Sequence, residues 1–136
     1  MPNSKGVRIT KKYIQKKFRT RDRYENEKMI YEMNLPYVPK LISHNDKNMI
    51  LQIKNQCCKT IAKLSPTQRK EYHSRLRDLY RQFRTDTGYY HNDFKPQNII
   101  IDNDDNLYLI DFESIGKKRI NSLDESKNMF HRKINI

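Results

Sequence analysis

The segment His91–Ile101 has the sequence HNDFKPQNIII, and the segment Leu107–Glu113 has the sequence LYLIDFE. Between them lies the polar stretch DNDDN at 102–106. Two short apolar runs separated by turn-forming residues predict a buried β-hairpin. Because the strands of a hairpin run antiparallel, Asn98, which precedes the first strand, and Asp111, which follows the second, should meet at one end.

These residues suit the chemistry of phosphoryl transfer. Its catalysis consists mostly of positioning and charge neutralisation. Asp93 supplies a carboxylate that can lie near an attacking hydroxyl, and Asp111 supplies a second one that can hold Mg²⁺ against phosphates. The amide oxygen of Asn98 is a further hard ligand for such a cation. The segment therefore predicts a phosphoryl-transfer site.

The same stretch resembles the catalytic loop and the metal-binding segment of the protein kinase-like superfamily, whose motifs are H-R-D-L-x-x-x-N and D-F-G. Here Asn92 replaces the Arg, Phe94 replaces the Leu, and Glu113 replaces the Gly. The residues at 111–113, Asp-Phe-Glu, are similar to those of choline and aminoglycoside kinases. The loop at 91–98 is more similar to that of protein kinases. In economy of parts, the chain resembles RIO-type and tRNA-modification-associated atypical kinases.

The resemblance implies specific roles for four residues. Asp93 would be the catalytic base, and Lys95 would contact the transferring phosphate, as is typical of Ser/Thr kinases. Asn98 and Asp111 would hold Mg²⁺, and ATP would be the phosphate donor. The chain has only three glycines, so the superfamily's G-x-G-x-x-G loop is absent or replaced.

The N-terminal part predicts a hairpin over Gly6–Phe18 and then a helix. The helix should start at Asp22, with Glu25 completing a capping box, and it should end at Leu35-Pro36. Glu27 falls inside the apolar arc of this helix. A charge on an inward face needs a partner, because an unpaired buried charge is costly.

The resemblance implies that partner. In kinase-like folds, a strand lysine pairs with a helix glutamate and grips the nucleotide phosphates. The segment 13–16 resembles the V-A-I-K strand, so Lys16 would pair with Glu27, and Ile14 on the same strand face would lie under adenine. Lys17 is an alternative phosphate lysine, since the two lysines are adjacent.

Two more strands are expected at Val38–Ile42 and Met49–Ile53. The second would lead into the hinge, where the backbone near Gln52, Ile53 and Lys54 is the expected adenine contact. A long helix should follow, with Ser65 as its N-cap and Gly88 as its stop. His91 should pack behind the catalytic loop and hydrogen-bond the backbone near Asp111. A short helix is expected within 114–128.

The expected fold class is therefore α+β, a truncated two-lobed protein kinase-like fold in a single minimal domain over 1–136. Residues 1–54 would form a small antiparallel sheet with one helix. Residues 55–136 would form a reduced helical lobe that carries the catalytic-loop hairpin. A full protein kinase domain is nearly twice as long, so whole elements should be missing. A truncated platform predicts that a partner protein or a homodimer completes the substrate site.

The composition limits the class and suggests partners. The chain is polar, with 35% hydrophobic residues and a mean hydropathy of −1.04. Its 28 basic and 16 acidic residues give a net charge of +12, which favours anionic partners such as ATP, acidic protein segments or nucleic acid. Adjacent Cys57 and Cys58 match no zinc or disulfide pattern. Neither a signal peptide nor a transmembrane stretch is visible, which predicts a location in the cytoplasm, or in the interior of a host cell.

Three functions remain open. The first is an active minimal kinase for protein Ser or Thr, favoured because Asp93, Lys95, Asn98 and Asp111 are all present. The second is a small-molecule kinase, favoured by Asp-Phe-Glu. The third is a non-catalytic nucleotide-binding pseudokinase or nucleic-acid-associated module, favoured by the short chain and its positive charge.

Overall fold

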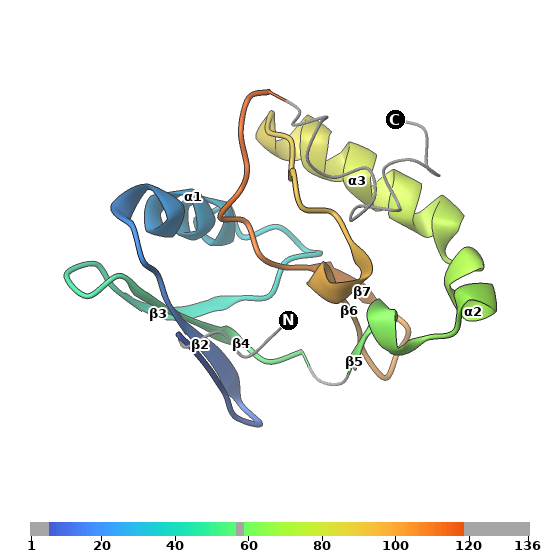
Figure 1. Cartoon of the computed structure of the whole chain (residues 1–136), viewed down its shortest axis with the longest axis horizontal. Helices are drawn as coiled ribbons and strands as arrows, with labels where there is room; N and C mark the ends of the chain where they lie inside the picture. The colour runs from blue at the N-terminus through green and yellow to red at the C-terminus, as the bar shows by residue number, and fades with distance from the viewer. Residues whose placement is uncertain (1–5, 57–58, 119–136) are drawn as a thin grey trace.

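The computed structural model describes residues 6–56 and 59–118. The fold is α+β, with a four-stranded antiparallel sheet and one helix in its N-terminal part (Figure 1). A three-stranded sheet and two further helices make up the C-terminal part. Among the described residues, no helix has the length and apolar character needed to cross a membrane.

The N-terminal sheet has the strand order β1-β2-β4-β3. The hairpin predicted over Gly6–Phe18 is confirmed by β1 and β2. The strand predicted from Val38 starts three residues later, at Leu41, because the Val38 N–H donates to the Leu35 carbonyl in a turn instead. β4 lies between β2 and β3 in this sheet, and its Leu51 pairs with Lys16 of β2. The strands are β1 (Val7–Ile9), β2 (Tyr13–Lys17), β3 (Leu41–Asn45) and β4 (Ile50–Lys54).

Helix α1 (Arg21–Glu32) lies between β2 and β3 in the chain. Its N-cap is Thr20 in an extended conformation, so the predicted start at Asp22 is wrong by one residue and the capping box with Glu25 does not form. The predicted inward position of Glu27 is confirmed, because its side chain is buried beside those of Tyr24, Ile30 and Tyr31.

The predicted long helix forms as two segments that are separated at Glu71 and Tyr72. Its ends agree with the sequence, because Ser65 caps the first segment and Gly88 ends the second in the left-handed conformation, with φ of 75°. Part of the helix expected within 114–128 falls outside the described residues. The helices are α2 (Pro66–Lys70) and α3 (His73–Thr87), and the small sheet contains β5 (Lys59–Thr60), β6 (Ile99–Ile101) and β7 (Leu107–Leu109).

The predicted hairpin is formed by β6 and β7, in which Ile99 pairs with Leu109. Just beyond this pair, the Ile110 N–H donates to the Asn98 carbonyl at 3.0 Å. The hairpin therefore brings the backbone of Asn98 next to the residue that precedes Asp111.

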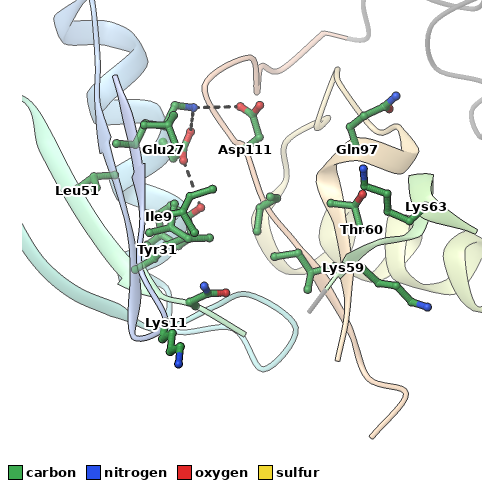
Figure 2. A pocket seen from close by; sticks show the side chains of 17 residues that line it. Ile9, Lys11, Glu27, Tyr31, Leu51, Lys59, Thr60, Lys63, Gln97 and Asp111 are labelled. Atoms are coloured by element: carbon green, nitrogen blue, oxygen red, sulfur yellow. Dashed lines mark hydrogen bonds and ion pairs between the residues drawn. The ribbon is translucent and has the colours of Figure 1, made fainter. Parts of the chain in front are cut away.

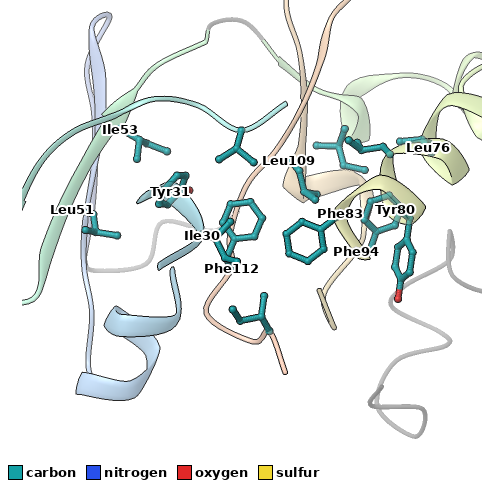
Figure 3. Close-up of a cluster of buried hydrophobic side chains, with 14 of the residues drawn as sticks. Ile30, Tyr31, Leu51, Ile53, Leu76, Tyr80, Phe83, Phe94, Leu109 and Phe112 are labelled. Atoms are coloured by element: carbon teal, nitrogen blue, oxygen red, sulfur yellow. The ribbon is translucent and has the colours of Figure 1, made fainter. Parts of the chain in front are cut away.

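An aromatic cluster links the two parts of the molecule (Figure 3). Phe112 is fully buried and stacks on Phe83 of α3, with 5.6 Å between ring centroids. Tyr31 of α1 meets the same ring edge-on at 5.3 Å. Because Phe112 packs against both helices, it fixes the chain segment that carries Asp111.

Candidate active site

A lysine on β2 and a glutamate on α1 form an ion pair at the centre of the site. The Lys16 Nζ lies 3.3 Å from Glu27 Oε1. Lys16 shares a strand face with Ile14, and both side chains line a cavity, whereas Lys17 is exposed on the other face. Of the two lysines that the sequence offered, the structure therefore places Lys16 in the site.

The buried Glu27 carboxylate also binds the segment that follows β7. It accepts hydrogen bonds from the Phe112 N–H at 3.0 Å and from the Tyr31 hydroxyl at 3.2 Å. Burial raises the pKa of Glu27 from 4.5 to about 7, although the Lys16 ammonium acts in the opposite direction. Burial alone would lower the pKa of Lys16, but the carboxylates around it raise that pKa above its ordinary value.

This shift predicts a pH dependence of stability. Between pH 4.5 and 7 the unfolded Glu27 ionises more readily than the folded one, so the free energy of unfolding should fall as pH rises through this window. Glu27→Gln lacks this titration. We expect the free energy of unfolding of the wild type, minus that of Glu27→Gln, to fall by up to about 3 kcal/mol between pH 4.5 and pH 8. Urea unfolding at several pH values measures it. Curves that stay parallel across the window would contradict the prediction, and Glu25→Gln, at an exposed position of the same helix, is the control.

His91 packs behind the loop at 91–98 and hydrogen-bonds the backbone near Asp111, as predicted. Its side chain is fully buried, with Nε2 3.0 Å from the Ile110 carbonyl and Nδ1 accepting from the Asp93 N–H at 3.1 Å. Burial lowers the pKa of His91, which favours the neutral ring that these two contacts require. His91 therefore ties the loop to the segment that precedes Asp111.

The loop residues Asp93, Lys95 and Asn98 lie together. The Asn98 side chain is buried, and its Nδ2 donates to the Asp93 carbonyl at 2.9 Å and to Asp93 Oδ2 at 3.0 Å. The Lys95 Nζ lies 3.3 Å from Asp93 Oδ1. Asp93 keeps 26% of its side chain exposed, so an acceptor group can reach it.

The donor set suits a hard divalent cation. Because both contacts of the Asn98 amide nitrogen go to Asp93, the amide oxygen remains to act as a ligand. Asp111 lies beside Lys16, with 3.4 Å between Oδ1 and Nζ, and has the uncommon backbone φ of 67°. Amide and carboxylate oxygens are the ligands that Mg²⁺ takes. Asn98 and Asp111 are therefore a chemically suitable pair of ligands for Mg²⁺.

A cavity of about 800 Å³ lies beside Lys16, Glu27 and Asp111 (Figure 2), and the loop residues Asp93, Lys95 and Asn98 are not among those that line it. Its size is within the usual range of small-molecule pockets. Glu27 and Asp111 lie at one end of it, where Lys16 contacts both. The rest of the wall is largely apolar and includes Val7, Ile14, Leu51, Ile53, Ile100 and Ile110.

Of the three residues expected to contact adenine, only Ile53 lines the cavity. Gln52 faces away and hydrogen-bonds the Gln15 side chain, since neighbouring residues on a strand point to opposite faces. The Lys54 side chain is exposed, and the backbone N–H of Lys54 already donates to the Lys40 carbonyl. The prediction concerned the backbone of 52–54: the Lys54 N–H is already bonded to Lys40, and a backbone contact of Gln52 with adenine stays a prediction.

Sequence reasoning missed several residues of the cavity wall. Asn55 could have been found, because it is two residues beyond Ile53 and strand alternation places it on the same side. Lys59, Thr60, Lys63 and Gln97 carry no such signal, because their positions depend on how the small sheet packs against the larger one. Glu113 departs from the D-F-G motif, and its Oε2 lies 2.6 Å from Lys16 Nζ, a contact that the motif does not predict.

A comparison of the sequence with models of known protein families agrees with this arrangement. The family model described as "RIO domain" matches residues 4–135. The chain belongs to the RIO domain family. This RIO domain chain also shares its fold with two structures of WbdD. One is of WbdD as a bifunctional kinase-methyltransferase, and the other is a co-crystal structure of WbdD with the kinase inhibitor LY294002.

The likeness to WbdD concerns the fold alone. The TM-scores are 0.62 and 0.59, with 16% and 20% sequence identity. Both matches cover 82% of the RIO domain chain but only 30% and 31% of the WbdD chains, so this chain spans about a third of their length. No curated protein matches the sequence.

Proposed function

We propose that this RIO domain chain is an ATP-dependent phosphotransferase that moves the γ-phosphate to a Ser or Thr hydroxyl of a protein. One observation carries the proposal: Lys16, Glu27 and Asp111 meet within 3.4 Å contacts at the end of a cavity of nucleotide-compatible size. Kinase-like folds place a lysine–glutamate pair and a metal-binding aspartate in this relation.

In the proposed reaction, the apolar wall around Ile14 and Ile53 binds adenine, and Lys16 binds the phosphates. Glu27 orients Lys16 and is itself held by the Phe112 N–H. Asn98 and Asp111 would hold Mg²⁺, which would neutralise charge on the phosphates.

Asp93 acts as the general base in the proposed reaction. The acceptor hydroxyl gives its proton to Asp93, its oxygen bonds to the γ-phosphorus, and the bond to the bridging oxygen of ADP breaks. Lys95, 3.3 Å from Asp93, supplies a positive charge beside the transferring phosphate. The preference for a protein acceptor rests on the form of the loop at 91–98, with Lys95 two residues after the base.

Transfer of label from γ-³²P-ATP tests the proposal. We expect the purified chain with Mg²⁺ to label an acceptor in a panel of proteins, on Ser or Thr, and to lose this activity in EDTA. Label in a small molecule rather than a protein would favour a small-molecule kinase. Nucleotide binding without any transfer would favour a non-catalytic nucleotide-binding module and would overturn the proposed activity.

A further inference from the structure

Glu113 stands where the D-F-G motif has glycine, and it makes the shortest of three carboxylate contacts to one ammonium group. Its Oε2 lies 2.6 Å from Lys16 Nζ, while the nearest oxygens of Glu27 and Asp111 lie at 3.3 Å and 3.4 Å. A lysine ammonium has three N–H donors. The three carboxylates can together occupy all three N–H donors of Lys16. A phosphate oxygen can therefore bind Lys16 only after one carboxylate has left.

Glu113 is the carboxylate that can leave at the lowest cost. Glu27 is buried and holds two further hydrogen bonds, from Phe112 and Tyr31. The side chain of Glu113 is 26% exposed and can therefore be rehydrated, whereas those of Asp111 and Glu27 are 19% and 4% exposed. An exposed carboxylate loses less on parting from its partner than a buried one.

The surroundings of Glu113 also allow its side chain to turn while its backbone stays. The Asn26 amide donates to the Glu113 carbonyl at 3.3 Å, which ties the main chain to α1. Arg23, one helical turn before Asn26, has its Nη1 3.9 Å from Glu113 Oε1. Arg23 thus offers Glu113 a second cation when Lys16 binds another anion.

We infer that Glu113 makes the site selective for nucleotide that enters with a divalent cation over metal-free nucleotide. This inference rests on the proposed nucleotide site. A metal-free triphosphate must displace Glu113 from Lys16 and then lie beside Glu27 and Asp111, whose ion-pair partner Lys16 it has taken. A divalent cation compensates those acids, because the carboxylate oxygens of Glu27, Asp111 and Glu113 lie within 4.8 Å of one another.

The test is the affinity for a fluorescent ATP analogue, measured by titration in Mg²⁺ and in EDTA. We expect Glu113→Gln, which keeps the shape and removes the charge, to raise the affinity in EDTA about tenfold, the size of one charge-assisted hydrogen bond that is partly screened. In Mg²⁺ the affinity should change by less than about threefold. Glu113→Ala should show the same gain in EDTA, which separates loss of the charge from any new contact of the amide.

Glu25→Gln is the matched control, because it makes the same chemical change at an exposed position of α1. Its affinity in EDTA should equal that of the wild type. An unchanged or weaker affinity of Glu113→Gln in EDTA, or an equal gain in Glu25→Gln, overturns the role of Glu113 while the nucleotide site stands. Failure of the wild type to bind nucleotide under both conditions overturns the site itself, and the role of Glu113 with it.

Discussion

Replacing Asp93 with Asn is expected to lower the rate of phosphate transfer by about 10²–10⁴-fold, the usual contribution of a positioned general base. The amide keeps the size of the side chain but cannot accept the proton of the attacking hydroxyl. Asp93 does not line the cavity, so the affinity for Mg²⁺-nucleotide should stay within about threefold of the wild type. Initial rates of label transfer and nucleotide titration measure the two effects separately.

The matched control is Asp104→Asn, which makes the same change at an exposed position of the turn between β6 and β7. Its transfer rate should equal that of the wild type. Because Asp93 also accepts a hydrogen bond from the Asn98 amide, thermal unfolding of each variant confirms that the loop is intact. Transfer by Asp93→Asn at the wild-type rate would exclude Asp93 as the base.

Replacing Asp111 with Asn is expected to have the second large effect, on binding as well as on transfer. The affinity for nucleotide in Mg²⁺ should fall by at least about 100-fold, because loss of a group that only supports a metal ligand already costs about 10–100-fold. The affinity in EDTA should fall little or rise, since the change removes one carboxylate 3.4 Å from Lys16. Transfer should become undetectable.

Titration of the fluorescent analogue in both conditions measures the effect of Asp111→Asn, with Asp104→Asn again as the control. The informative quantity is the ratio of the affinities with and without Mg²⁺. A ratio equal to that of the wild type would show that Asp111 does not hold the cation. Equal losses in both conditions would instead assign Asp111 a part in shaping the cavity.

Local patterns predicted the parts of the fold and site that depend on residues close in sequence. The short apolar runs at 99–101 and 107–110, with a polar turn between them, predicted the hairpin and thereby the approach of Asn98 to the segment of Asp111. The helical position of Glu27 predicted both its burial and its need for a cation.

Contacts between distant segments could not be read from such patterns. Helical periodicity continues through Glu71 and Tyr72, so it did not reveal the break between α2 and α3. The approach of Glu113 to Lys16 joins residues nearly a hundred positions apart and depends on the docking of α1. The expectations of a homodimer and of a nucleic-acid partner stay predictions, as they concern surfaces rather than the site.

The hydrogen bond from the Phe112 N–H to the Glu27 carboxylate has a mechanical consequence. It connects α1 directly to the backbone of the segment that bears Asp111, and the Tyr31–Phe112 ring contact reinforces this connection. Neither α1 nor that segment can swing outward alone without leaving a buried carboxylate short of a donor. Any inactive conformation of this small domain should therefore displace α1 and Asp111 together.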